Sequence, residues 1–339
     1  MNALLSMEDL KTIASKANLS PSVHNTQPTR WHIADDNALW VLAQPDRYLT
    51  IGDPKCNDAA ISCGTALMGT HLALSEVGLK AAKTDLLWND KKASPINGLV
   101  PVARLELMQS ETIEPLANTV TSRFTWRGGF AKSENSALSK LNELASIDPS
   151  ITIVSDKSEI AHIADMNDAV SLKFFQHKEY REELLSWMRL AKSNTQWALD
   201  GMNYEALCLN SLEAFCANHA LKSPMFEVLD KLRLAASIVS EKSKTESSAA
   251  LVFFHRPIEE NPVESGMHFY KAWLQLTNQG FVCWPMAVVA DSPETNEYCV
   301  KRYKLPPEHR LINVLRIGVI PKNKTIPSRA RLEENNLIV

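Results

Sequence analysis

Two short segments concentrate side chains that could bind an anion. Arg123-Phe-Thr125-Trp-Arg127 places a hydroxyl between two guanidinium groups, and Arg329-Ala-Arg331 supplies two more arginines near the C-terminus. A phosphate dianion is bound well by guanidinium groups combined with hydroxyl or backbone N–H donors, so either segment could hold one. Arginine pairs with this spacing are also common on solvated surfaces. The spacing alone does not show that the two segments form one site.

A third segment, residues 21–28, places hydrogen-bonding side chains between two prolines. It reads Pro-Ser-Val-His-Asn-Thr-Gln-Pro and contains Ser22, Asn25 and Gln27. Proline restricts the backbone, while serine, asparagine and glutamine offer donors and acceptors, so the segment suits recognition of a polar planar ligand. An ordinary turn between a helix and a strand uses the same residue types. Both interpretations remain open at this point.

Several other chemistries lack their sequence patterns. The 11 glycines form neither G-x-G-x-x-G nor a P-loop, and the six cysteines include no C-x-x-C pair. The nine histidines include no H-E-x-x-H, and no G-x-S-x-G is present. We therefore predict no Rossmann turn, no metal site and no serine-hydrolase centre, and we name no catalytic residue.

Composition narrows the class of protein. The chain has 339 residues with 45% hydrophobic residues and a net charge of −3, so it is long enough for two globular domains and gives no electrostatic reason to bind nucleic acid. The sequence contains no apolar run of about 20 residues, the length that a membrane-spanning helix needs. The N-terminal residues show no basic segment followed by an apolar core. We therefore expect a cytoplasmic protein with no membrane partner and with reduced cysteines.

The hydrophobic pattern indicates an α+β protein with one sheet and many helices around it. A capped amphipathic helix is expected from Ser6 onward, followed by a hairpin of strands at 31–33 and 38–43. Further helices are expected at 57–77, 134–146, 157–186, 203–220 and 222–238, and further strands at 100–108, 151–154, 249–255 and 311–319.

A weak internal repeat relates residues 64–79 to residues 266–281. Both copies begin with glycine, have a second glycine 14 positions later, and continue with a large apolar residue. The second glycine is typical of a left-handed helix stop. Similar strands follow each copy, Val102-Ala-Arg-Leu105 and Val314-Leu-Arg-Ile317. Either the chain contains a duplication, or two helices of this length share a few leucines.

Taken together, these motifs resemble the FMN-dependent nitroreductase superfamily, and most closely its tandem-fused, Acg-like branch. The family's P-S-x-x-N-x-Q-P-W loop is similar to residues 21–29, its R-x-[ST]-x-R phosphate motif to residues 123–127, and its C-terminal basic-x-Arg-Leu segment to residues 329–332. The loop precedes the arginines here, which is the inverse of the order in ordinary homodimeric members. The fused branch has this order, and the internal repeat agrees with it.

The resemblance implies a nitroreductase-like fold made of two fused, degenerate units that form a pseudo-dimer within one chain. We expect the first unit at residues 1–118 and the second at residues 119–339, with one composite flavin site shared between them. Because such a chain carries its own partner unit, a monomer is expected.

The resemblance also implies the residues of an FMN site. Arg123, Thr125, Arg127, Arg329 and Arg331 would hold the phosphate and ribityl chain, and Ser22, Asn25 and Gln27 would lie near the flavin. The loop over the isoalloxazine would be Trp284, Pro285, Met286 and Ala287. The sequence departs from the family at Thr29, where tryptophan is usual, at Gly128-Gly129, which replaces bulkier residues, and in residues 285–287, which contain no acid.

The function implied is that of an FMN-dependent oxidoreductase. Hydride would pass from NAD(P)H through flavin N5 to a small electrophilic substrate, nitroaromatic, quinone-like or enone-like. The alternative is a protein that sequesters flavin beneath a closed lid with little or no turnover. Residues 186–204 are the candidate lid, with Trp187 and Trp197 large enough to cover a ring.

Overall fold

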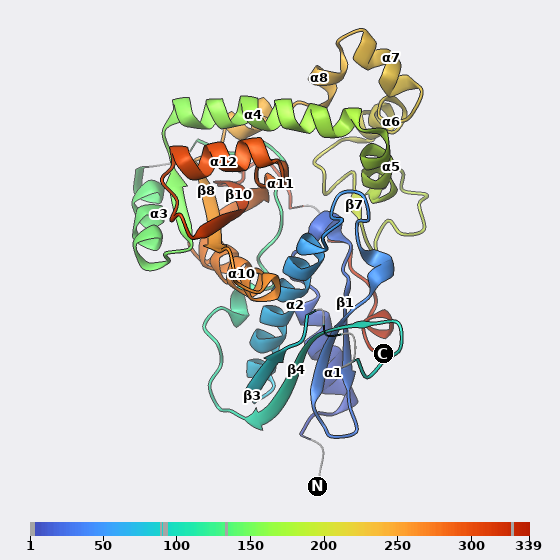
Figure 1. Ribbon diagram of the computed structural model, residues 1–339, viewed down its shortest axis with the longest axis vertical. Helices are drawn as coiled ribbons and strands as arrows, with labels where there is room; N and C mark the ends of the chain where they lie inside the picture. Colours follow the sequence, from blue (N-terminus) through green and yellow to red (C-terminus); the bar gives the residue numbers. More distant parts are fainter. Residues whose placement is uncertain (1–3, 89, 91–93, 133–134, 327–328) are drawn as a thin grey trace.

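Two antiparallel four-stranded sheets form the frame of the molecule (Figure 1). The computed structural model describes residues 4–88, 90, 94–132, 135–326 and 329–339. The first sheet has the order β1-β2-β4-β3 and the second β5-β8-β10-β9. Helices pack on both sheets, which confirms the predicted α+β class. Two sheets take the place of the single sheet expected from the hydrophobic pattern.

The first sheet belongs to the N-terminal part of the chain. Its strands are β1 (Thr29–Ile33), β2 (Leu39–Ala43), β3 (Leu79–Leu86) and β4 (Val100–Gln109). Helices α1 (Met7–Ala17) and α2 (Asn57–Glu76) share a buried core with it. Ser6 caps α1 in a capping box with Asp9, as its spacing predicts.

The second sheet is buried on both faces. Its strands are β5 (Ile151–Val154), β8 (Ala250–Pro257), β9 (Val282–Pro285) and β10 (His309–Gly318). Val252 and Phe254 of β8 pack in the same core as α3 and α10, whereas Leu251 and Phe253 pack in the core that contains α4, α11 and α12. The alternation follows from the two-residue period of a strand.

The remaining elements are mainly helical. The helices are α3 (Asn135–Ile147), α4 (Lys157–Gln176), α5 (Lys178–Ser186), α6 (Ser211–Ala220), α7 (Met225–Lys231), α8 (Ala235–Val239), α9 (Lys242–Glu246), α10 (Pro262–Asn278), α11 (Ala287–Asp291) and α12 (Pro293–Arg302). Two short parallel strands, β6 (Met188–Arg189) and β7 (Met202–Asn203), lie between α5 and α6.

Helices α2 and α10 join the two halves at a contact between glycines. A Cβ on Gly64 would lie 2.0 Å from the carbonyl oxygen of Val263, and a Cβ on Gly266 would lie 2.2 Å from that of Ile61. Each glycine therefore permits the approach of the other helix's backbone, and the contact is reciprocal, as in a two-fold interface. These are the first glycines of the two sequence copies.

The second glycines of the repeat also have the expected conformation. Gly78 has φ +75° and Gly280 has φ +89°, and each follows its helix and precedes a strand. Because such φ values are readily adopted only by glycine, both act as helix stops. The repeat is thus matched by structure at both glycines, which supports the fused pseudo-dimer. The boundary at residues 118 and 119 remains a prediction.

Three expected helices differ from those observed. The helix expected over 157–186 is interrupted at His177, whose extended backbone ends α4 and whose ring accepts the N–H of Tyr180 to begin α5. The helix expected over 203–220 begins only at Ser211, because Asn210 caps it together with Glu213. Residues 222–238 form two helices, α7 and α8.

Two extended segments carry the arginine motifs to the junction of the halves. The C-terminal tail returns to the outer edge of the first sheet, where Trp31 exchanges backbone hydrogen bonds with Leu337 and Val339. Thr125 forms an isolated parallel bridge with Cys283 of β9. Arg329 and Arg331 therefore approach on a segment beside the first sheet, and Arg123 and Arg127 on a segment beside the second.

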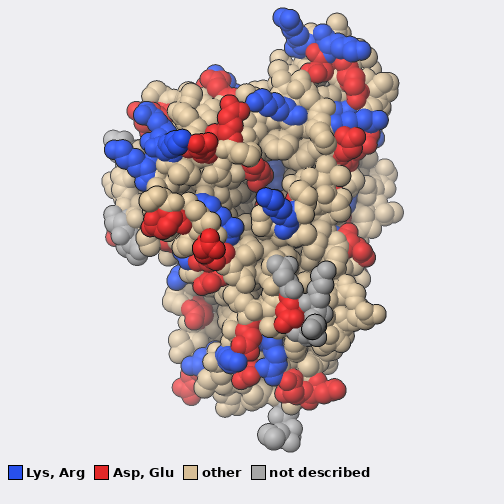
Figure 2. All heavy atoms as spheres, in the orientation of Figure 1, with Lys and Arg blue, Asp and Glu red and all other residues tan. Residues whose placement is uncertain are grey.

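Acidic and basic side chains are mixed over the face seen in Figure 2, and neither sign forms a continuous patch there. Among the described residues, no helix combines the length and the apolar character needed to cross a lipid bilayer.

Candidate functional site

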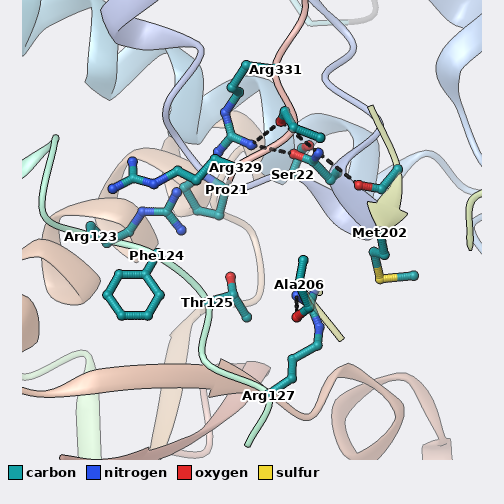
Figure 3. A pocket seen from close by; sticks show the side chains of 13 residues that line it. Pro21, Ser22, Arg123, Phe124, Thr125, Arg127, Met202, Ala206, Arg329 and Arg331 are labelled. Atoms are coloured by element: carbon teal, nitrogen blue, oxygen red, sulfur yellow. Dashed lines mark hydrogen bonds between the residues drawn. The ribbon is translucent and has the colours of Figure 1, made fainter. Parts of the chain in front are cut away.

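A small cavity lies where four distant segments meet (Figure 3). Its lining comes from residues 21–25, 123–127, 201–206 and 329–331. The cavity volume is about 70 Å³. A space of this size holds a few water molecules or one phosphate group.

Seven of the predicted site residues line this cavity. They are Ser22, Asn25, Arg123, Thr125, Arg127, Arg329 and Arg331. Arg123, Arg329 and Arg331 lie together on one side, and Arg127 lies across from them beyond Thr125 (Figure 3). The structure thus unites the two arginine motifs, which their spacing alone did not predict.

Arg123 is held by aromatic rings and a backbone carbonyl. Only 2% of the residue is exposed, and its guanidinium lies 5.0 Å from the ring centre of Trp273 and 5.9 Å from that of Tyr270, both on α10. One Nη donates to the carbonyl of Leu19. The buried Nε has no hydrogen-bond partner. This side chain therefore retains donor capacity in a setting where a buried donor normally finds an acceptor.

Arg331 and Arg329 are likewise held mostly by backbone oxygens. Arg331 donates to the Asn25 side chain at 2.7 Å and to the carbonyl of Leu19 at 3.1 Å, and its buried Nε has no partner. Arg329 donates to the carbonyl of Thr121. Arg127, on the other side, donates to the carbonyl of Ala206 at 3.2 Å. All four cations thus have neutral partners.

No carboxylate forms an ion pair with these four arginines within the described part of the chain. Burial lowers the pKa of Arg331 to about 9 and the pKa values of Arg123 and Arg127 to about 10. Neighbouring cations lower the pKa of Arg331 further. A cluster of this kind is compensated when an anion binds, because a buried charge without a counterion is costly.

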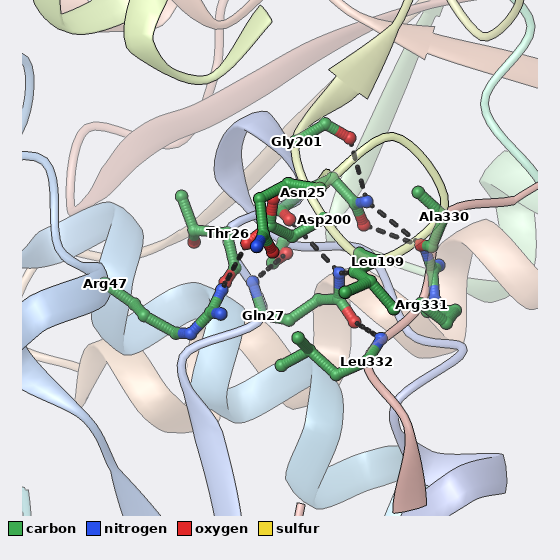
Figure 4. A network of polar contacts seen from close by, with 12 residues as sticks. Asn25, Thr26, Gln27, Arg47, Leu199, Asp200, Gly201, Ala330, Arg331 and Leu332 are labelled. Atoms are coloured by element: carbon green, nitrogen blue, oxygen red, sulfur yellow. Dashed lines mark hydrogen bonds and ion pairs between the residues drawn. The ribbon is translucent and has the colours of Figure 1, made fainter. Parts of the chain in front are cut away.

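The loop of residues 21–28 is used differently from its predicted role. Ser22 lines the cavity and accepts the N–H of Gln27 at 3.0 Å. Gln27 is 2% exposed and does not line the cavity; its amide binds Asn18, Leu332 and the carbonyl of Leu199. These hydrogen bonds join α1, the C-terminal tail and the candidate lid (Figure 4).

The candidate lid, residues 186–204, contributes Gly201 and Met202 to the cavity wall and is tied to the same loop. Asn25 exchanges hydrogen bonds with Gly201, whose N–H donates to the Asn25 carbonyl at 3.2 Å and whose carbonyl accepts the Asn25 amide at 3.0 Å. Asp200 pairs with Arg47 at 3.1 Å (Figure 4). It also pairs at 2.6 Å with Arg189, which lies within the candidate lid. The C-terminal part of the candidate lid is therefore attached to the rest of the fold through Asp200 and Gly201.

The lid tryptophans do not cover the cavity. Trp197 packs edge-on against Tyr204, and Trp187 lies beside the guanidinium groups of Arg47 and Arg189. Gly201 and Met202 form the cavity wall instead. Ala206 also lines the cavity, and its backbone carbonyl accepts a hydrogen bond from Arg127. The sequence gives no signal for this contact because every residue type has a backbone carbonyl.

The four predicted residues of the 284–287 loop do not line the cavity. Trp284 is buried beneath Arg316, whose guanidinium lies 3.4 Å from the ring centre, and Met286 is buried in the core of the second sheet. Pro285 and Ala287 are partly exposed. The loop follows β9, and β9 lies directly beside Thr125.

Comparison with known proteins gives local similarity to named nitroreductases. No family model matches the chain. A Mycobacterium tuberculosis protein, "Putative NAD(P)H nitroreductase Rv3131", is 36% identical over 74 residues, which is 22% of this chain and 21% of that protein. A second from the same organism, "Putative NAD(P)H nitroreductase acg", is 30% identical over 80 residues, 24% of each chain. The matched part is thus about a fifth to a quarter of the length of these relatives.

Among solved structures, a Bacteroides fragilis nitroreductase with bound FMN has a TM-score of 0.34 at 11% identity, covering 63% of this chain and 92% of that one. The FMN- and NADPH-dependent nitroreductase NfnB from a Sphigopyxis strain has a TM-score of 0.36 at 15% identity, covering 67% and 98%.

Over these matched residues the chain is similar to proteins named as nitroreductases. The relative named acg agrees with the Acg-like resemblance of the motifs.

Proposed function

We propose that this protein is an FMN-dependent oxidoreductase of the nitroreductase type. The observation that carries the proposal is the cavity lined by Arg123, Arg127, Arg329 and Arg331, none of which is paired with a carboxylate of the described chain. A terminal phosphate carries the charge and the acceptor oxygens that such a cluster binds best. FMN supplies that phosphate, and relatives of this chain are named nitroreductases.

Two segments of the chain would share the binding of FMN. Arg329 and Arg331 from the C-terminal tail, together with Arg123 and Arg127 from the segment beside β9, would hold the phosphate and ribityl chain, and the Thr125 hydroxyl would add a donor. The unpartnered buried Nε atoms of Arg123 and Arg331 are donors that fit an anion at this place. Asn25 would hold Arg331 in position, since their hydrogen bond fixes the guanidinium.

When bound, FMN would supply the redox chemistry, taking hydride from NAD(P)H and passing it to a small electrophile of the nitroaromatic, quinone-like or enone-like class. The residues of the chain would position the cofactor and exclude water from it. We also propose that the protein is a monomer, because the reciprocal α2–α10 contact already supplies the partner unit within one chain, and that it acts in the cytoplasm.

Flavin binding by an Arg127→Ala variant tests the proposal directly. Wild-type protein should purify with flavin absorbance or take up added FMN, and Arg127→Ala should lose at least about tenfold in FMN affinity, since hydrogen bonds to charged groups contribute about 1.5–3 kcal/mol each. The matched control is Arg302→Ala, which removes an exposed arginine paired with Glu159. Equal FMN affinity in both variants would contradict the site.

A second function, sequestration of flavin, is favoured by one observation. The lid is fastened to the loop of residues 21–28 and to the C-terminal tail through Gly201, Leu199 and Ala198. A lid fastened in this way would keep NAD(P)H away from bound flavin.

Anaerobic reduction distinguishes the two functions. If the protein is a reductase, NADPH should bleach the absorbance of the FMN-loaded protein as fully as dithionite does. If it sequesters flavin, dithionite should bleach the absorbance and NADPH should not, and deletion of residues 186–204 should make NADPH effective. Equal resistance to NADPH after the deletion would remove the lid explanation.

A further inference from the structure

A carboxylate is captured by three consecutive backbone N–H groups on the turn before α2. Glu183, on α5, accepts the N–H of Thr50 at 2.6 Å and of Ile51 at 3.0 Å through one oxygen, and the N–H of Gly52 at 2.7 Å through the other. The Thr50 hydroxyl donates to the same carboxylate at 3.1 Å. Successive N–H groups that converge on one point form an anion-binding nest. We call residues 50–52 the nest.

The structure around the nest fixes it independently of Glu183. Asp53 follows immediately, is 6% exposed, and accepts the N–H groups of Asn57 at 2.8 Å and Ala59 at 2.9 Å, which anchors the turn to the start of α2. A Cβ on Gly52 would lie 3.3 Å from the Glu183 carboxylate and from the Tyr180 ring. Glycine at this position therefore allows the close approach of an anion.

Glu183 also connects the nest to the lid. It lies on α5, which ends at Ser186 where the lid begins. The far end of the lid is fastened by Asp200, which pairs with Arg47 outside the lid. Asp200 also pairs with Arg189, which lies within the lid near its first residue, so this pair joins the two ends of the lid to each other. Glu183 on the nest and Asp200 on Arg47 therefore hold opposite ends of the lid.

We propose that the nest is a second anion site, one that binds phosphate groups, and that Glu183 occupies it as a built-in competitor that latches the lid shut. One set of N–H donors cannot bind the carboxylate and a phosphate together, so a phosphate that enters the nest displaces Glu183 and releases this end of the lid. The phosphate comes either from the nucleotide NADPH or from inorganic phosphate. That the lid covers a flavin rests on the proposed function, whereas the latch and the nest do not.

Amide hydrogen exchange on the flavin-free protein tests the latch without any need for activity. In Glu183→Ala, the Thr50, Ile51 and Gly52 amides should exchange about 10- to 100-fold faster than in wild type, as expected for loss of charged hydrogen bonds. The lid amides of Met202 and Tyr204, which donate to the carbonyls of Trp187 and Arg189 at the released end, should also exchange faster. The control is Glu182→Gln, the neighbouring glutamate, which reaches Lys178 at 3.8 Å. Unchanged exchange of Met202 and Tyr204 would overturn the latch.

Titration of the same variant tests the nest as a binding site. Inorganic phosphate and NADPH are added separately to Glu183→Ala, and at least one should restore slow exchange at Thr50, Ile51 and Gly52. Protection by NADPH alone would identify a nucleotide subsite, and protection by both would identify a general phosphate site. Protection by neither would overturn the anion site. Gly52→Ala provides an independent variant, since the added Cβ crowds Glu183 and should speed exchange of the lid amides while leaving Asp53 as the cap of α2.

Failure of these tests and failure of the proposed function are separable. Flavin binding by the wild-type protein and by Arg127→Ala reports on the arginine cavity only. Exchange of the nest amides reports on residues 50–52 only.

Discussion

Buried arginines behave differently in two regions of the molecule. Away from the cavity, Arg189 pairs with Asp200 at 2.6 Å, Arg316 pairs with Glu241 at 2.7 Å, and Arg181 pairs with Glu227. At the cavity, Arg123 and its three neighbours have carbonyls and an amide as partners. The first group is compensated within the fold, and the second is not.

The presence or absence of a carboxylate partner separates arginines that are part of internal ion pairs from arginines that are available to bind an anionic ligand. A buried cation with its counterion removed costs about 3–5 kcal/mol, so a fold retains a cluster of unpaired cations only where something else offsets it. One unpaired arginine is not enough for this inference. Arg30 is 4% exposed, donates only to the carbonyls of Gln27 and Thr29, and lines no part of the cavity. What distinguishes the cavity is that four such groups converge.

The largest change in the free energy of unfolding is expected when a paired buried arginine loses its counterion and so becomes unpaired, like the arginines at the cavity. Asp200→Asn removes the charge between Arg189 and Arg47 and should lower the free energy of unfolding by about 3 kcal/mol. Urea denaturation measures the change. Glu205→Gln, which breaks an exposed pair with Lys192, is the control and should cost less than about 1 kcal/mol. Equal losses would mean that pairing does not distinguish the buried arginines.

Inorganic phosphate should stabilise the flavin-free protein through the cavity. At a hundred times its dissociation constant, a ligand that binds only the folded state raises the free energy of unfolding by about 2.7 kcal/mol. Thermal unfolding in phosphate, against chloride at the same ionic strength, measures the effect. In Arg331→Met the gain should fall by more than half. A gain of the same size in this variant would place the stabilising anion elsewhere.

Replacement of a cavity arginine by an apolar side chain should make the flavin-free protein more stable. Arg123→Met removes an uncompensated charge and should raise the free energy of unfolding by about 1 kcal/mol, while it weakens FMN binding. The matched change in the other region, Arg316→Met, leaves Glu241 without its partner and should lower stability. Urea denaturation of both variants compares them. A loss of stability in both would break the distinction between the two regions.

The smallest effect is expected at His24, beside the cavity. Burial and, to a smaller extent, the nearby charge of Arg127 together lower the pKa of His24 from 6.5 to about 4, against a small opposing effect of Glu183. Because the unfolded chain binds the proton more readily, this histidine reduces stability as the pH falls from 6.5 towards 4. A phosphate bound near Arg127 should raise the pKa of His24 by less than about one unit. An NMR titration with and without phosphate measures the shift, and a fall in pKa would contradict an anion near Arg127.

The sequence predicted the arginines but not their separation into two groups. Motif spacing marked Arg123, Arg127, Arg329 and Arg331, because the resemblance to a family carries specific positions. It did not show that they share one cavity, since this depends on the tail returning to the edge of the first sheet. Nor did it show that Arg316 has a different role, because a paired arginine and an unpaired one look alike in a sequence.

Local signals gave most of the fold. The capping box at Ser6 and the helix-stop glycines were readable because they act over a few residues. The break at His177 was not, because it depends on a ring nitrogen accepting one backbone N–H. The role of Gln27 within the fold was not readable either. Its side-chain type suits a ligand, and its amide joins three chain segments; its place near a flavin remains a prediction.

The glycine contact between α2 and α10 bears on how such a chain can evolve. In a homodimer, a substitution at the crossing point enters both subunits at once, so the two sides must change together. Here Gly64 and Gly266 are separate codons, and each half can accumulate changes that the other does not share. One segment of the chain can then specialise in delivering Arg329 and Arg331, and another in delivering Arg123 and Arg127. The two-fold relation between the copies is thus retained where the two helix backbones touch. At other positions each copy can change without a matching change in the other.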